Sequence, residues 1–204
     1  IGGVNPAWDY ISRSIKNGKH IVTANKELLA KKGKELFNLA EKHNRVVLYE
    51  AAIAGGIPLI MPIKTIVAGN KISKIRGILN GTTNYILTKM DVDGASYDTV
   101  LKEAQELGYA ETDPTGDVEG FDAMYKITTL STIAFGKRVN LDKVYREGIT
   151  KVRAEDMEKA NELGYKIKLV ALGNLSEDGK ADVRVHPMLV SKHSSLAHTN
   201  YVTN

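Results

Sequence analysis

The chain has 204 residues, of which 43% are hydrophobic and 25% are charged, and its formal net charge is +4. This composition is typical of a soluble globular protein, and the absence of cysteine excludes disulfides, thiol chemistry and cysteine-based zinc sites. No apolar run reaches the roughly 18 residues that suggest a membrane span, and no nucleic-acid-binding motif is present, so we expect neither a membrane nor a nucleic-acid partner.

Helical and extended patterns alternate through the first 57 residues. Pro6 suits the first turn of a helix and Gly18 suits its end, and leucines at helical spacing mark a second, lysine-rich helix. The expected elements are helices at 6–18 and 26–43 and strands at 20–24 and 46–53. This alternation is the repeating unit of a parallel α/β sheet.

After Pro58 the pattern changes to a mixture of helices and strands, which indicates an α+β unit. We therefore place a domain boundary there, giving segments 1–57 and 58–204. The elements expected in the second segment are helices at 59–68, 82–90, 96–108, 121–136 and 155–164 and strands at 71–80, 167–175 and 181–189.

No glycine-rich phosphate-binding turn is present, because the glycines lack both the G-x-G-x-x-G and the Walker A spacing. If the protein uses a dinucleotide, that turn lies upstream of Ile1. The chain also starts without methionine and ends at Asn204 without a cap or tail signal. We therefore expect a fragment of a longer protein.

Five acids and one base lie within residues 111–126, ETDPTGDVEGFDAMYK. Such a stretch could be a metal loop, a solvated acidic loop or the rim of an active site. An EF-hand loop that starts at Asp113 requires glycine where Val118 stands, so the metal loop is excluded. The other two interpretations remain open.

The helix that follows is poor in charge. From Phe121 to Phe135 only Asp122 and Lys126 are charged, and their spacing of four places them on one face. A helix of this kind is at least half buried, with an apolar stripe beside the charged face. The pair could lie at the edge of a cleft, where a lysine can donate a proton, or it could be a simple surface ion pair.

Residues 104–126, AQELGYAETDPTGDVEGFDAMYK, match the signature of homoserine dehydrogenases throughout. GKHIVTANKELLA (18–30), YEAAIAGGIPLI (49–60) and GILNGTTNYIL (77–87) also resemble segments of that family. The resemblance covers essentially the whole chain. It implies NAD(P)H-dependent reduction of L-aspartate 4-semialdehyde to L-homoserine, in the biosynthesis of threonine, methionine and isoleucine.

The resemblance also implies the architecture of the protein. Residues 1–57 would be the second half of a Rossmann-like, α/β nucleotide-binding domain. Residues 58–204 would be an α+β substrate-binding and dimerisation domain, with helices packed on a mixed sheet. The resemblance further implies a cytoplasmic protein that forms a homodimer. A fragment without the glycine-rich turn and the C-terminal end would itself be inactive.

Site residues follow from the match, position by position. Lys126 would be the proton donor, Asp122 would orient it or hold a water, and Lys26 would lie between cofactor and substrate. The substrate-binding residues implied by the match are Glu111, Asp117, Tyr109 and Thr82. Two further acids have structural interpretations: Asp113 as a turn residue before Pro114, and Glu119 as a favourable charge at a helix N-terminus.

A monovalent cation, usually sodium, is also implied by the resemblance. Its ligands would be the side chain of Glu50 and the carbonyls of Ile53, Gly55 and Ile57, and hard cations prefer such oxygen ligands. The alternative is a strand end with a glycine hinge.

Three readings of the whole remain. The protein could be a homoserine dehydrogenase, a related dehydrogenase of another amino-acid aldehyde, or, as an isolated fragment, a non-catalytic dimerisation module. The choice between NADP(H) and NAD(H) depends on upstream residues.

Overall fold

The chain folds into two compact units, as the computed structural model describes for residues 1–202. The first unit comprises residues 1–73 and 125–143, and the second comprises residues 74–124 and those from 144 onward. Helix α8 (Phe121–Ala134) contributes its first turn to the second unit and the remainder to the first. No helix between residues 1 and 202 has the length and apolar character needed to span a membrane.

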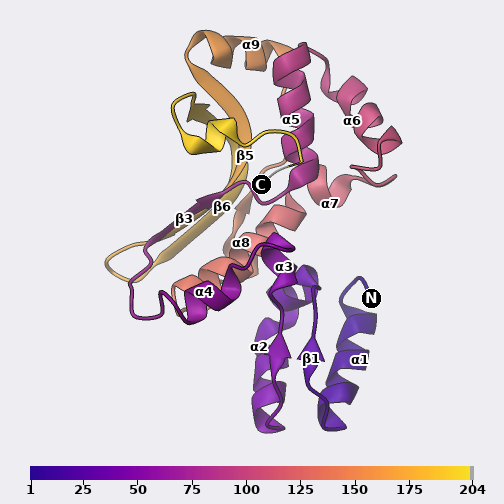
Figure 1. Ribbon diagram of the computed structural model, residues 1–204, viewed down its shortest axis with the longest axis vertical. Helices are drawn as coiled ribbons and strands as arrows, with labels where there is room; N and C mark the ends of the chain where they lie inside the picture. Colours follow the sequence, from indigo (N-terminus) through magenta and orange to yellow (C-terminus); the bar gives the residue numbers. More distant parts are fainter. Residues whose placement is uncertain (203–204) are drawn as a thin grey trace. The chain divides into compact units, whose positions relative to one another are not determined.

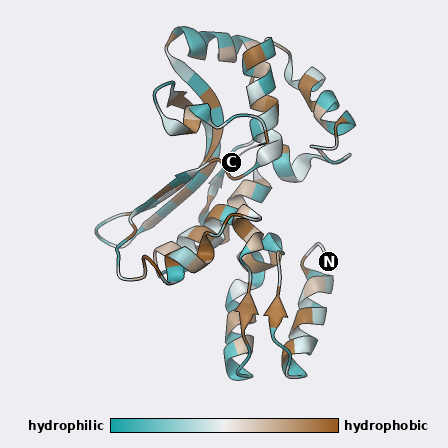
Figure 2. Cartoon of the chain, in the orientation of Figure 1, coloured by the Kyte–Doolittle hydropathy of each residue, from teal (hydrophilic) through white to brown (hydrophobic). Residues whose placement is uncertain are grey.

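The first unit is built on two short parallel strands, β1 (Ile21–Val22) and β2 (Val47–Leu48), and the helices α1 (Asn5–Lys16) and α2 (Lys26–Lys42) contact each other beside them (Figure 1). Ile21 pairs with Val47 and Val22 with Leu48, and the strands are among the most hydrophobic parts of the unit (Figure 2). Its elements are α1 (Asn5–Lys16), β1 (Ile21–Val22), α2 (Lys26–Lys42), β2 (Val47–Leu48), α3 (Ala51–Ala54), α4 (Ile60–Lys64), most of α8 and the 3-10 turn η1 (Leu141–Lys143).

Local sequence explains helix α2. The side chain of Asn25 accepts a hydrogen bond from the Leu28 amide at 2.9 Å, which caps the first turn. The leucines predicted to form the apolar face are buried, among them Leu28 and Leu36 at 0% exposure. The strand predicted at 46–53 is too long, because residues 51–54 form the helical turn α3. Alanine favours helix there, and Gly55 ends it with a positive φ of 59°.

The second unit contains a four-stranded mixed sheet in the order β3-β5-β6-β4. The pairs β3–β5 and β5–β6 are antiparallel, whereas β4 is parallel to β6. Its elements are β3 (Lys74–Gly77), α5 (Gly81–Asp93), α6 (Tyr97–Glu106), α7 (Thr115–Val118), the start of α8, β4 (Tyr145–Arg146), α9 (Ala154–Glu162), β5 (Tyr165–Leu175), β6 (Ala181–Ser191) and the 3-10 turn η2 (Ser195–His198).

Helix α5 is the central support of this unit. It packs against β5, α6 and α9, and its buried residues point in all directions around the axis, including Thr83, Tyr85, Leu87 and Met90. The helix begins after Asn80, whose side chain caps it, and ends at Gly94 in the left-handed conformation. Close packing around such a helix leaves it little room to move. The residues at its N-terminus are therefore held firmly.

Candidate active site

Two carboxylates of the acidic stretch share one side-chain amide. Asn80 Nδ2 donates to Asp117 Oδ1 at 2.7 Å and to Asp122 Oδ2 at 3.0 Å. Asn80 and Asp122 are each only 5% exposed. The structure therefore brings two sequence-predicted residues together, and it does so through Asn80, which the sequence analysis did not single out.

Thr82 and Tyr109 are also brought together. The Thr82 hydroxyl donates to the Tyr109 carbonyl at 2.8 Å, and the Tyr109 ring lies 4.9 Å from the ring of Tyr85. Glu111 follows on an exposed segment, where Gln105 Nε2 donates to its carbonyl at 3.1 Å. Thr82 is two residues from Asn80, so the substrate-binding residues predicted from the match gather around the start of α5 and the loop after α6.

The residues after β4 hold the opposite side of the acidic loop. The Ile149 amide donates to the Val118 carbonyl at 2.8 Å, and the Thr150 hydroxyl donates to Glu119 Oε1 at 3.0 Å. Gly148 lies so close that a Cβ there would come within 2.3 Å of the Val118 carbonyl oxygen. The loop is thus clamped between Asn80 on one side and residues 148–150 on the other.

The two acids interpreted as structural have structural contacts. Asp113 Oδ1 accepts from the Thr115 amide at 3.1 Å, which confirms the predicted turn. Hydrogen bonds from the Thr115 hydroxyl and amide lower the pKa of Asp113. Glu119 lies at the end of α7, where it contacts Thr150 and forms an ion pair with Arg146 at 3.6 Å.

Helix α8 has the half-buried, charge-poor character that its sequence predicts. Ala123, Ile127 and Leu130 of the apolar stripe are at most 3% exposed. Asp122 and Lys126 are its charged residues, one turn apart, and Lys126 is partly buried. Asp122 and Lys126 therefore lie on the same face of α8, because residues four apart in a helix are neighbours.

Lys26 lies in the first unit, at the carboxyl end of β1. It opens α2, where the side chain of Asn25 donates to the carbonyls of Ile1 and Gly3 at 3.2 and 2.8 Å. A hollow of about 470 Å³ is lined there by residues 1–3 and 22–27. Ligands of α/β sheets bind at the carboxyl ends of parallel strands. This polar hollow, with Lys26 in its wall, is therefore a candidate site for part of a nucleotide cofactor.

Glu50 follows β2 at the same edge of the sheet. Its carboxylate accepts from the amides of Leu59, Ile60 and Met61 at 2.5, 2.7 and 2.9 Å. Burial acts to raise the pKa of Glu50, but these three donors outweigh it and the pKa is lowered. Glu50 therefore anchors the start of α4. The monovalent cation site with Ile53, Gly55 and Ile57 stays a prediction.

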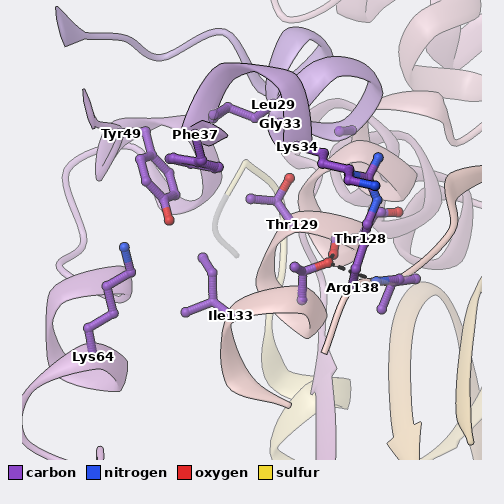
Figure 3. A pocket seen from close by; sticks show the side chains of 13 residues that line it. Leu29, Gly33, Lys34, Phe37, Tyr49, Lys64, Thr128, Thr129, Ile133 and Arg138 are labelled. Atoms are coloured by element: carbon purple, nitrogen blue, oxygen red, sulfur yellow. Dashed lines mark hydrogen bonds between the residues drawn. The ribbon is translucent and has the colours of Figure 1, made fainter. Parts of the chain in front are cut away.

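An apolar cavity of about 410 Å³ lies elsewhere in the first unit, between α2, Tyr49, α4 and the end of α8 (Figure 3). Leu29, Phe37 and Ile133 form part of its wall, and basic side chains also border it, including Lys34, Lys64 and Arg138. None of the residues that the sequence implicates in chemistry lines this cavity. The candidate active site is therefore distinct from it.

Family profiles match both segments of the chain. The profile described as homoserine dehydrogenase matches residues 58–204, and the profile of its NAD binding domain matches residues 1–50. Homoserine dehydrogenases from Neisseria gonorrhoeae and Synechocystis are each 50% identical to this chain over all of its length, covering 46% and 48% of the relatives. The chain thus spans about half the length of the curated relatives it matches.

Solved structures agree with these matches. A homoserine dehydrogenase from Thiobacillus denitrificans is 47% identical, with a TM-score of 0.96 over 99% of this chain and 47% of that protein. A hyperthermophilic archaeal homoserine dehydrogenase, solved in complex with NADPH, is 30% identical, with a TM-score of 0.80 over 94% of this chain and 55% of that one. The predicted fold class, part of a Rossmann-like domain followed by an α+β domain, is confirmed. The chain belongs to the homoserine dehydrogenase family.

Proposed function

We propose that the full-length protein interconverts L-aspartate 4-semialdehyde and L-homoserine with a nicotinamide cofactor. One observation carries this proposal: the buried side-chain amide of Asn80 hydrogen-bonds both Asp117 and Asp122. Asp122 lies in the first turn of α8, the helix that also carries Lys126. Through this reaction the enzyme would serve threonine, methionine and isoleucine biosynthesis in the cytoplasm.

The substrate presents an α-ammonium group and an aldehyde, and these need opposite partners. Carboxylates hydrogen-bond strongly to an ammonium group, which supports Asp117 and Glu111 as its partners. Thr82 and Tyr109, joined by their hydrogen bond, would line the same region. The substrate-binding set would therefore orient the amino-acid end and leave the aldehyde for the lysines.

NAD(P)H, when bound at the carboxyl end of β1, supplies a hydride to the aldehyde carbon. The carbonyl oxygen then gains negative charge and must take up a proton to become the hydroxyl of homoserine. The Lys126 ammonium would donate that proton, and Asp122, one turn earlier, would orient it. Lys26 would stabilise the negative charge on the oxygen. In the reverse direction Lys126 would accept the hydroxyl proton.

Turnover by the full-length protein tests this proposal. We expect L-homoserine to be oxidised when NAD⁺ or NADP⁺ is added, measured by the appearance of the reduced nicotinamide. Running both cofactors side by side determines the preference. If other amino-acid alcohols reacted and homoserine did not, the protein would be a related dehydrogenase of a different amino-acid aldehyde.

The isolated 204-residue chain should bind NADPH weakly and be inactive. The reason is that this sequence has no glycine-rich phosphate-binding turn. In addition, Val22 and Leu48, on the two strands of the first unit, are 82% and 54% exposed, whereas parallel sheets normally have both faces covered. Calorimetry with NADPH tests this, and tight binding would contradict it.

We also propose a homodimer, on family resemblance, which light scattering after size-exclusion chromatography would test.

A further inference from the structure

We propose that Asn80 is a positioning residue, which holds Asp117 in place for the ammonium group of the substrate and holds Asp122 beside it, one turn before Lys126. This inference rests on the proposed function and adds to it a residue outside the signature segment 104–126. Asn80 lies in the loop between β3 and α5, 37 and 42 residues from the two acids that it joins.

The orientation of the Asn80 amide follows from its other contacts. Asn80 Oδ1 accepts from the Thr83 amide at 2.8 Å and from the Thr83 hydroxyl at 2.8 Å. The Thr83 amide can only donate, so exchanging the oxygen with the NH₂ group would lose that bond and would turn an oxygen towards two carboxylates. The NH₂ group therefore faces the acids, and each of its hydrogens has a carboxylate as acceptor.

The chemical nature of the bridge determines what the pair can do. Two carboxylates at one site repel each other, and an N–H donor shared between them offsets part of that repulsion. A lysine or arginine in this place would also cancel negative charge. The amide of Asn80 has no net charge, so it fixes the positions of Asp117 and Asp122 without cancelling their charge, and Asp117, which is partly exposed, can meet a cation. An ammonium group is the cation that the proposed substrate carries.

Rigid surroundings make this bridge effective. Asn80 caps α5, which is buried on all sides, and Asp122 begins α8, so the amide connects the starts of two helices. The acidic loop is held from its other side through the Ile149–Val118 hydrogen bond. A binding group that is supported in this way needs little reorganisation when a ligand arrives.

Two substitutions separate this role from helix capping. Serine and aspartate are good N-caps, so Asn80→Ser and Asn80→Asp keep an acceptor for the Thr83 amide. Serine removes both N–H donors, whereas aspartate also adds a third carboxylate against the pair. Ser96→Ala is the matched control, because Ser96 caps the neighbouring helix α6 through the Thr99 amide and is exposed.

The readout is competitive inhibition of homoserine oxidation by the full-length protein with two probes. L-2-Aminobutyrate has the ammonium group of the substrate, and butyrate lacks it. We expect Asn80→Ser to raise the inhibition constant of aminobutyrate by about tenfold or more, which is the effect of losing a buried hydrogen bond to a charged group. The inhibition constant of butyrate should change little. Asn80→Asp should raise the inhibition constant of aminobutyrate further, and Ser96→Ala should change the inhibition constant of neither probe.

The outcomes distinguish this inference from the proposed function. If the unmodified protein turns over homoserine and both Asn80 variants keep its preference for aminobutyrate, the inference is overturned. Equal weakening of both probes would also overturn it, since that indicates a general structural effect. If the unmodified protein does not act on homoserine, the proposed function fails instead. Thermal unfolding checks that each variant is folded, and an unfolded Asn80→Ser leaves Asn80→Asp to decide.

Discussion

The ammonium group of Lys168 lies 2.7 Å from the carbonyl oxygen of Thr199, in the interior of the second unit. Lys168 is 3% exposed, and its Nζ also lies within hydrogen-bonding distance of side-chain oxygens of Asn84, Thr88 and Asn200, at 3.1 to 3.2 Å, so its three hydrogens are shared among four acceptors. None of these four acceptors is a carboxylate. Lys168 therefore fastens the segment after η2 to β5 and α5 with neutral partners around a buried charge.

This arrangement predicts a dependence of stability on pH. Burial lowers the pKa of Lys168 from 10.5 to about 8, with Asp91 opposing the shift and Lys166 adding to it. Between these two values the unfolded chain binds a proton that the folded chain has released. Stability contributed by this group therefore rises as the pH increases from about 8 to 10.5.

Urea unfolding of the full-length protein and its Lys168→Met variant over this pH range tests the prediction. Because other groups titrate too, the difference between the two proteins is the measurement. We expect the free energy of unfolding to increase with pH more steeply in the unmodified protein. Lys159→Met, which replaces an exposed lysine of α9, is the control. Parallel curves for the unmodified protein and Lys168→Met would contradict the prediction.

Replacing Glu50 by glutamine should weaken the start of α4. The variant keeps an acceptor but loses the charge that three backbone amides stabilise, and hydrogen bonds to charged groups contribute roughly 1.5–3 kcal/mol each. The lowered pKa of Glu50 gives stability that is present above the ordinary value of 4.5 and lost as the pH falls through the folded-state pKa. Thermal unfolding should show a difference between the two proteins at neutral pH that shrinks under acidic conditions.

The same variant tests the predicted cation. A carboxylate offers about four lone-pair directions, and three N–H donors occupy three of them in Glu50, so one remains for a cation. If sodium binds there, it should raise the melting temperature of the unmodified protein more than tetramethylammonium at equal ionic strength. Glu50→Gln should respond equally to both salts. No specific sodium effect in the unmodified protein would count against the site.

Local patterns in the sequence predict much of this structure. The spacing of leucines indicates α2, the near absence of charge indicates the buried character of α8, and Asp113 before Pro114 indicates the observed turn. Each of these features depends on residues within about one or two helical turns of each other. The strand predicted at 71–80 exists only at Lys74–Gly77, because strand ends are determined by a partner strand.

Other features depend on residues that are far apart in the chain. In Asn80, the sequence signal is that of a helix cap before Gly81, and it does not reveal two acids some 40 residues away. Nothing in the sequence around Lys168 indicates that this lysine is buried, since its partner Asn84 is 84 residues distant. The signature segment thus identifies the acids, but only the tertiary structure identifies what holds them.

Gly148→Ala should disturb the acidic loop. An added Cβ would come within 2.3 Å of the Val118 carbonyl oxygen and 2.6 Å of Glu119 Cα, so backbone must move on one side or the other. Overpacking of this kind costs roughly 1–3 kcal/mol. Asp117 precedes Val118, so we expect weaker homoserine binding together with a lower melting temperature.

Gly116→Ala is the matched control in the same loop. A Cβ at Gly116 meets nothing within 4 Å, so stability and homoserine affinity should stay close to those of the unmodified protein. Thermal unfolding and steady-state kinetics of the two variants give the comparison. Equal behaviour of Gly148→Ala and Gly116→Ala would show that the close approach at residue 148 is not needed for the site.

Lys126→Ala should remove the proposed proton donor. General acid catalysis contributes roughly 100- to 10,000-fold to a rate, so we expect kcat to fall by at least about 100-fold while the KM for NADPH changes little. Lys126→Arg keeps the positive charge but is a much weaker acid, and it should be nearly as slow. The control is Lys102→Ala, at an exposed position of α6, which should be fully active.

The partner acid supplies a second measurement on the same helix. Asp122→Asn removes the charge one turn before Lys126 and replaces an acceptor of the Asn80 amide by a group that can also donate. If Asp122 orients the lysine, this variant should lower kcat, and adding Lys126→Ala should cause little further loss, because the two residues act together. Independent, multiplicative losses would show that they act separately. Near-normal turnover of Lys126→Ala alone would remove that lysine from the mechanism.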